Sequence, residues 1–98
     1  MSSDIVDYRE YMSNDHKVYV DVNEDRYKDG RLIPLSFVWE DGNRYEIDQV
    51  LDVRPAASLK AGGAGMRYTV RIRSRETYMF LEEDNGLSKW FMERRLNR

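Results

Sequence analysis

An alternation of apolar and polar side chains constrains this chain more than any other feature. It is clearest over residues 66–73, where the apolar positions are Met66, Tyr68, Val70 and Ile72 and the polar positions are Arg67, Thr69, Arg71 and Arg73. Successive side chains of a β-strand point to opposite faces, so this period predicts a strand buried on one face only. The arginines are expected on its solvated face.

The same period recurs along the chain and predicts five or six short antiparallel strands. The first begins at Lys17 with apolar residues at even positions up to Val22, while Tyr27 falls on the other parity. That change predicts a bulge within residues 23–26. Further strands are expected over residues 32–40, 44–53, 66–73, 77–81 and 87–96. The last segment also suits a helix capped by Ser88, and we favour the strand.

Turn residues connect these strands. Residues 28–31, Lys-Asp-Gly-Arg, predict a hairpin turn. Pro34 suggests a strand start or an exposed edge, because proline donates no ladder hydrogen bond. After the second strand, whose core face would hold Leu35, Phe37 and Trp39, a loop of residues 41–43 would pair Trp39 with Tyr45. In the following strand, 44–53, the alternation slips once near Asp48 and Gln49.

The chain of 98 residues is expected to form one domain. Residues 17–98 are predicted to be a single β-barrel domain, and residues 1–16 an acidic tail or a short helix. Short strands with hairpin turns and no convincing long helix predict an all-β fold, a small five- to six-stranded antiparallel barrel of SH3-like or OB-like type. One short terminal helix is compatible with that prediction.

Composition excludes several classes of site. The absence of cysteine excludes disulfides, thiolate zinc sites and cysteine nucleophiles. The single histidine, His16, lies in a polar stretch, and the carboxylates gather at turns without the spacing of a calcium loop. We therefore expect a protein that is not an enzyme and has no cofactor or metal. No leader and no apolar span of about 18 residues is visible, so a cytoplasmic location without membrane contact is expected.

The segment 56–65 is rich in glycine and offers two interpretations. Consecutive backbone amides near Lys60, Gly62, Gly63 and Gly65 could cradle a phosphate. However, no Gly-Lys-Ser or Gly-Lys-Thr follows, and a strand stands where a helix N-terminus would be needed. A plain connector between strands is the stronger interpretation.

The arginines of residues 67–75 give the sharper hypothesis. If the strand stays regular, one face carries a row made of Arg67, Arg71, Arg73 and Arg75. Such a row could follow a phosphate backbone, with arginine planes or aromatic rings stacking on bases. Alternatively, these arginines pair with Glu46, Glu76 or Glu82 across strands. The sequence pI near 5.4 argues against a general nucleic-acid binder and for local, salt-sensitive contact.

A second group of basic residues lies in the last ten residues of the sequence. It consists of Lys89, Arg94, Arg95 and Arg98, beside Trp90 and Phe91. Solvated ends are the simpler interpretation, but a last strand adjacent to the arginine strand would merge the two groups into one patch.

Three segments resemble small uncharacterised proteins of Gram-positive anaerobic bacteria. The segments are Ile33–Gly42, Val50–Gly65 and Arg67–Ile72, and the likeness spans roughly residues 17–95. A looser similarity connects the chain to a family of unknown function found in gene neighbourhoods of lesion-bypass DNA polymerases. Its shared positions are Phe37, Trp39, Tyr45, Ile47, Tyr68, Val70, Tyr78, Trp90 and Arg94. The resemblance implies a small barrel and a pathway rather than a mechanism.

These observations favour a non-enzymatic binding module whose partner is nucleic acid or a nucleic-acid-processing protein. Its contacts would come from Lys60, the glycine loop and the four arginines. The alternative is a protein adaptor that binds a partner strand at an exposed sheet edge, such as the one beside Pro34. A third possibility is an enzyme that acts on a phosphorylated small molecule through Lys60. We expect a monomer or a weak dimer.

Overall fold

The structure is a computed structural model that describes residues 17–56, 64–84 and 86–94. All regular structure in these ranges is β-strand, which confirms the all-β prediction. The strands are β1 (Lys17–Arg26), β2 (Leu32–Val38), β3 (Arg44–Glu46), β4 (Gln49–Pro55), β5 (Ala64–Ile72), β6 (Arg75–Asp84) and β7 (Leu87–Glu93). The predicted tail or helix of residues 1–16 lies outside the described residues.

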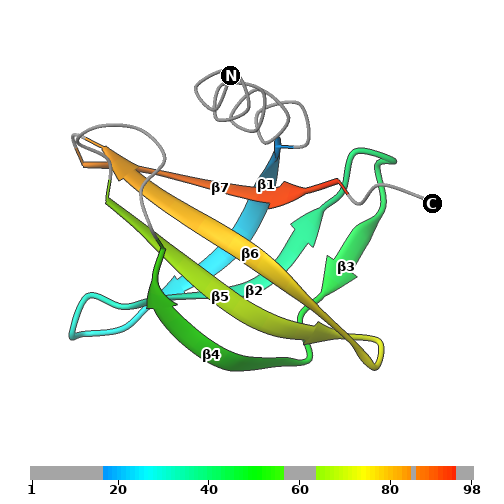
Figure 1. The fold of residues 1–98 in the computed structure, drawn as a ribbon, viewed down its shortest axis with the longest axis horizontal. Coiled ribbons are helices and arrows are strands. Elements are labelled where there is room, and N and C mark those ends of the chain that lie inside the picture. The colour runs from blue at the N-terminus through cyan, green and yellow to red at the C-terminus, as the bar shows by residue number, and fades with distance from the viewer. Residues whose placement is uncertain (1–16, 57–63, 85, 95–98) are drawn as a thin grey trace, which may run out of the picture.

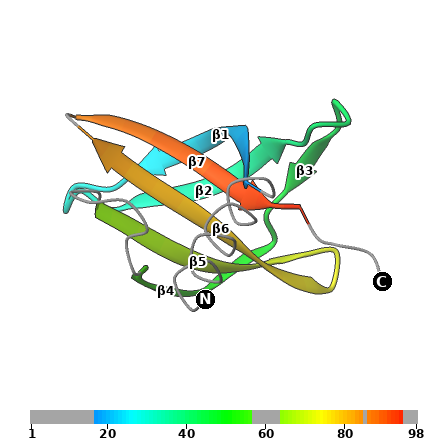
Figure 2. The ribbon, with the colours of Figure 1, turned by 45° about the horizontal axis from the view of Figure 1, so that its top comes forward.

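The strands form one antiparallel sheet with the order β3-β2-β1-β7-β6-β5-β4 (Figure 1). The sheet curls strongly, so that β4 and β3, which are its two edges, approach each other (Figure 2). β1 contributes to the curl because its first part pairs with β7 and its second part, from Asp21 onward, pairs with β2. The result is a barrel-like fold with one concave and one convex face.

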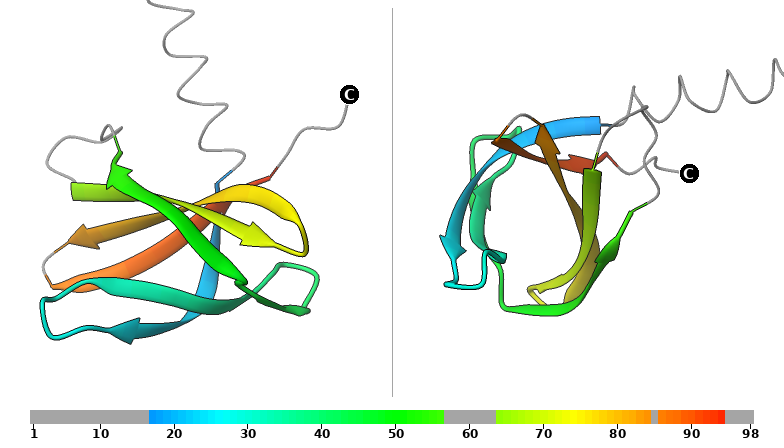
Figure 3. Two further views of the ribbon diagram at one scale, coloured as in Figure 1. Left: turned by 90° about the horizontal axis from the view of Figure 1, so that it is seen from below. Right: turned by 90° about the vertical axis from the view of Figure 1, so that its left-hand side faces the viewer.

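The two edges of the sheet meet at a pair of consecutive residues. The N–H of Ile47 donates to the carbonyl of Leu35 on β2, and the N–H of Asp48 donates to the carbonyl of Arg71 on β5, each at 2.9 Å. β4 therefore follows directly from the β2–β3 hairpin (Figure 3). The single strand expected over residues 44–53 is thus divided into β3 and β4, so the described residues contain seven strands and not five or six. The slip in alternation near Asp48 and Gln49 marks this division.

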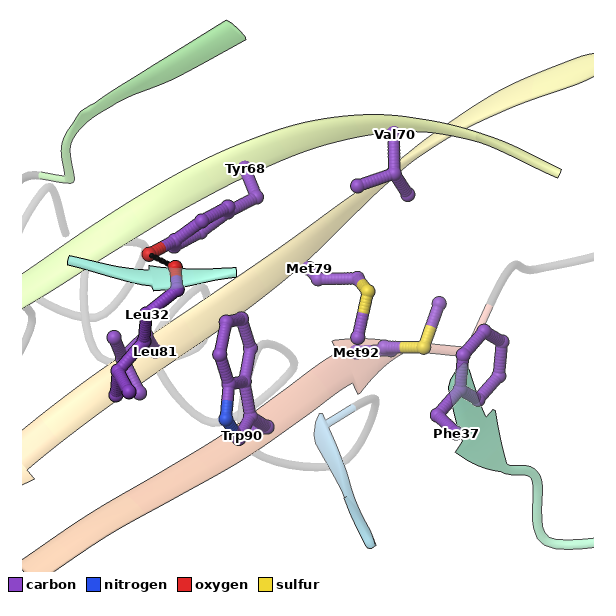
Figure 4. Packing of buried hydrophobic residues seen from close by; sticks show 8 residues of the cluster. All are labelled: Leu32, Phe37, Tyr68, Val70, Met79, Leu81, Trp90 and Met92. Carbon is purple, nitrogen blue, oxygen red and sulfur yellow. Dashed lines mark hydrogen bonds between the residues drawn. The ribbon is translucent and has the colours of Figure 1, made fainter. Parts of the chain in front are cut away.

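The core lies on the concave face, as the alternation of residues 66–73 predicts. Val70 and Met79 have no exposed surface, and Tyr68, Leu81 and Trp90 are also buried (Figure 4). The polar ends of the two large rings have partners. The Tyr68 hydroxyl donates to the Leu32 carbonyl at 2.6 Å, and the indole N–H of Trp90 donates to the Glu24 carboxylate. Both rings can therefore be buried without an unpaired donor.

The β1–β2 hairpin has the predicted turn and bulge, but the extra residue is on the other strand. Asn23 pairs with Ser36 and Glu24 pairs with Pro34, so Leu35 has no partner residue on β1. A bulge changes the parity of its own strand, so Pro34 is buried and Leu35 is 41% exposed. The predicted core position of Leu35 is wrong. The edge beside Pro34 stays a prediction, because β3 pairs with residues 36–38 of β2 and not with Pro34, although the Pro34 side chain itself is buried.

The β2–β3 turn begins one residue earlier than predicted. The N–H of Trp39 donates to the carbonyl of Asn43 at 2.9 Å, so the loop is residues 40–42, and Phe37 pairs with Tyr45. The left-handed residue of this turn is Gly42, with φ 86°. Glycine adopts this conformation without the steric cost of a Cβ atom. The register moves by two residues, so the predicted faces of Phe37 and Tyr45 are retained and their rings stack at 5.5 Å.

The C-terminal half contains a tight β-meander. β5 begins at Ala64, earlier than predicted, and most of the glycine-rich segment, residues 57–63, lies outside the described residues. β7 confirms the strand interpretation of residues 87–93 and shows that the alternative helix is wrong there.

Candidate functional site

The convex face of β5 carries two of the four predicted arginines. Arg67 and Arg71 alternate with the buried Tyr68 and Val70, so their side chains leave the strand on the side away from the core. They are separated on this face by Thr69. The structure therefore confirms that Arg67 and Arg71 share the solvated face of the strand, as predicted.

The other two arginines do not belong to that face. β5 ends at Ile72, and Arg73 and Ser74 form the turn with φ values of 51° and 69°. Ile72 pairs with Arg75, so Arg75 lies on the core side of the hairpin. A row of four arginines is therefore wrong, because a two-residue turn replaces the regular strand that the parity argument assumed.

Arg73 is engaged at the joint between the sheet edges. Its backbone N–H donates to the Asp48 carboxylate at 2.9 Å, and its guanidinium lies 5.2 Å from the centre of the Tyr45 ring. These contacts hold the β5–β6 turn against the residues that connect β3 and β4. The position of Arg73 is therefore explained by the fold.

The predicted anion cradle stays a prediction, because most of its residues lie outside the described ranges. Lys60, Gly62 and Gly63 lie outside the described residues. Gly65 is part of β5, pairs with Glu82, and accepts a 3.0 Å hydrogen bond from the N–H of Ala56. Gly65 is therefore an ordinary residue of the β-sheet, and its carbonyl is already hydrogen-bonded.

Arg71 is partly neutralised by its neighbours. Its guanidinium lies 3.3 Å from the carboxylate of Glu76, the residue opposite it on β6, and 3.2 Å from the side-chain oxygen of Gln49. The prediction of cross-strand pairing thus holds for Arg71 and Glu76. Glu82 instead accepts from Lys17 at 3.5 Å. An exposed pair of this kind contributes little stability and can be exchanged for another anion.

Arg67 has a different environment. Its guanidinium carbon lies 4.5 Å from the centre of the Tyr78 ring, within the range of a cation–π contact. Within the described part of the chain, its Nε is buried and has no hydrogen-bond partner. A guanidinium in a cation–π contact can still donate hydrogen bonds to an anion through its terminal nitrogens.

Tyr78 begins a row of aromatic side chains that the sequence analysis missed. We call this the outer aromatic row; it consists of Tyr78 and Phe80 on β6, Phe91 on β7 and Tyr19 on β1. Neighbouring ring centres are 6.3, 4.8 and 5.7 Å apart. Register places these residues on the convex face, opposite the core residues Met79 and Trp90. The sequence carries little signal for this row, because residues 78–81 are apolar at both parities.

Cations also accompany the Tyr19 end of this row. The Nζ of Lys17 lies 4.5 Å from the centre of the Phe91 ring, and that of Lys89 lies 5.7 Å from the Tyr19 ring. The Tyr19 hydroxyl donates to Glu82 at 2.9 Å. Burial and this carboxylate raise the pKa of Tyr19, so its hydroxyl stays protonated at neutral pH.

The C-terminal basic group does not merge directly with the arginines of β5, because β6 lies between β5 and β7. Lys89 joins the convex face, whereas Arg94 forms two hydrogen bonds with the Glu40 carboxylate at 3.0 and 2.9 Å. Arg95 and Arg98 lie outside the described residues. Only Lys89 of this group is thus placed beside the outer aromatic row.

Carboxylates and histidines do not gather into a metal site in the described residues, where no group of three or more potential ligands is found. None of the described segments is a helix long and apolar enough to cross a membrane. Comparisons with protein families, curated proteins and solved structures found no match. The resemblance to uncharacterised bacterial proteins stays a prediction.

Proposed function

We propose that this chain is a non-enzymatic binding module that contacts nucleic acid through the convex face of β5 and β6, on a small barrel of SH3-like or OB-like type. The observation that carries the proposal is Arg67, whose guanidinium carbon lies 4.5 Å from the centre of the exposed Tyr78 ring on the convex face. Arg71 lies on the same face, and its partners there, the Glu76 carboxylate and the Gln49 side-chain oxygen, are both exposed. Phosphate is the common anion that bidentate guanidinium groups recognise best.

The formal net charge of the chain is −2. Contact with a nucleic acid is therefore confined to the one face where the arginines lie. A few arginines on one face would hold a phosphate backbone, while the acidic remainder of the chain repels it, so affinity should fall steeply with salt. A nucleic-acid-processing protein is compatible as the partner that brings the module to its target. The cysteine-free composition supports a cytoplasmic location.

Fluorescence anisotropy tests this proposal. Labelled single-stranded DNA, duplex DNA and RNA would be titrated with the full chain at about 50 and 200 mM salt. Saturable binding to one of them that weakens between the two salt concentrations is the expected result. No binding at the lower salt concentration would overturn the proposal.

The alternative function, a protein adaptor, is favoured by one observation. Among the described strands, β4 is an edge strand that pairs with β5 alone, and its Val53 is 41% exposed. An extended peptide could add to this edge. Such a complex would persist at high salt, which separates it from nucleic-acid binding, and Val53→Lys would weaken it.

A further inference from the structure

We infer that the nucleic acid held at this face is single-stranded and that its bases stack on Tyr78 and Tyr19, at the two ends of the outer aromatic row. The inference rests on the proposed function and adds the class of ligand and the residues that read it. Three observations carry it: the exposure of the two tyrosines, the spacing of the rings and the position of the cations.

The terminal rings of the row are open to solvent, and the inner rings support them. Tyr78 is 44% and Tyr19 is 52% exposed, whereas Phe91 is 6% exposed. Phe91 is nevertheless absent from the core cluster, because it lies on the opposite face of the sheet. Phe80 stacks on Phe91 with an angle of 7° between the ring planes. The two phenylalanines therefore fix the tyrosines in place, which lowers the entropic cost of binding a base.

Ring spacing favours an extended strand over a duplex. The two exposed tyrosines are separated along the row by Phe80 and Phe91, with steps of 4.8 to 6.3 Å between neighbouring ring centres. Bases stacked on the tyrosines are therefore not neighbours in a continuous duplex stack, whose rise is about 3.4 Å per nucleotide. A base pair inside a duplex presents only its edges in the grooves, while an unpaired base presents its π face. Exposed rings on a convex sheet can thus be used by a single strand and not by a duplex.

Cations beside the row match the backbone of such a strand. Arg67 covers one face of Tyr78, while Lys17 lies over Phe91 and Lys89 over Tyr19. Arg67 and Lys89 therefore add positive charge at the two ends of the row, whereas Lys17 is paired with Glu82. This combination of stacking surface and cations is used for sequence-tolerant binding of single strands.

The test compares a labelled oligothymidine with an abasic strand of the same length, which has the same phosphates and no bases. Anisotropy is measured with the full chain and with Tyr19→Ser and Tyr78→Ser. The matched control is Tyr27→Ser, because Tyr27 is also exposed but lies at the β1–β2 turn. Thermal unfolding verifies that each variant is folded.

We expect the abasic strand to bind weakly and each variant in the row to lose roughly 5- to 150-fold in affinity for oligothymidine, with an unchanged salt slope. Tyr27→Ser should bind like the parent chain. Equal binding of the abasic strand, or unchanged affinity in both row variants, would overturn this inference while leaving the proposed function intact. Failure of the parent chain to bind any nucleic acid would overturn both.

Discussion

Two large aromatic residues of the core, Tyr68 and Trp90, are buried apolar rings whose single polar atom forms a hydrogen bond. Tyr68 is the clearest case, since its ring packs against Trp90 with centres 4.9 Å apart while its hydroxyl reaches the Leu32 carbonyl across the barrel. That hydrogen bond connects β5 to the start of β2, two strands that are not neighbours in the sheet. Arg67 is the contrasting case, because its charge is stacked on a ring and its Nε is left unpaired.

Tyr68→Phe should lower the free energy of unfolding by about 1–3 kcal/mol, because a buried carbonyl loses its donor while the ring is retained. Urea unfolding followed by tryptophan fluorescence measures the change. Tyr27→Phe, at an exposed ring, is the control and should stay close to the parent chain. Equal stability of the two variants would show that the hydroxyl of Tyr68 does not contribute.

Asp41 should make stability depend on pH at the acid end. Hydrogen bonds from the backbone N–H of Asn43, its side-chain amide and the Tyr45 hydroxyl lower the pKa of this carboxyl. The contribution is therefore complete above the unfolded-chain pKa of about 3.9 and is lost as the pH falls through the lower folded value. Asp41→Asn should destabilise the chain at pH 7 and much less at pH 2.5 in urea unfolding. A pH-independent difference would contradict this account.

At the scale of elements, hairpin turns determine which residues share a face. The β5–β6 turn is unusual, because Arg73 and Ser74 both have positive φ and neither is glycine or asparagine. Two-residue hairpin loops favour Asn-Gly at these positions. The contacts of Arg73 with Asp48 and Tyr45 compensate for this strain.

Ser74→Gly should raise the free energy of unfolding by about 1 kcal/mol, because the left-handed conformation no longer carries a Cβ penalty. Ser88→Gly is the matched control. Ser88 pairs with Glu83 inside the ladder, where glycine costs roughly 0.5–1 kcal/mol. Chemical unfolding of both variants should give changes of opposite sign. A loss of stability in Ser74→Gly would contradict the role assigned to the turn.

Periodicity predicted the strands well because parity is a local property of the backbone. It placed Tyr68, Val70, Arg67 and Arg71 on their observed faces. It failed where a single residue changes the parity, as at Leu35, or where a turn has no glycine signal, as at Ser74. The outer aromatic row was missed for a related reason: residues 78–81 are apolar at both parities, so the sequence does not show which ring faces outward.

At the scale of the whole molecule, the fold joins the edges of one curled sheet at Ile47 and Asp48. The carboxylate of Asp48 also accepts from Arg73, so this residue connects the joint to the β5–β6 turn through its backbone and its side chain. The core then fills the concave face, while the convex face carries Arg67, Arg71 and the outer aromatic row. The asymmetry of the two faces, rather than the net charge, is the basis of the proposed function.

Asp48→Ala should therefore destabilise the chain by about 1–2 kcal/mol, since the N–H of Arg73 loses a charged acceptor. Amide hydrogen exchange should show the largest increase in the β5–β6 turn and at the β3–β4 connection. Asp52→Ala, which removes an exposed carboxylate paired with Arg54 on β4, is the control and should leave these amides protected. Equal exchange in both variants would contradict the assignment of Asp48 as the anchor.

The most direct test of the central claim compares two double variants that remove the same charge. Arg67→Gln with Arg71→Gln removes it from the convex face of β5. Arg31→Gln with Arg75→Gln removes it from the β1–β2 turn and the core side of the β5–β6 hairpin. Binding of labelled single-stranded DNA is measured against salt. We predict that the first pair weakens binding and lowers the salt slope by about 0.7 per lost phosphate contact, whereas the second retains the parent slope. Equal effects of the two pairs would contradict a site on the convex face.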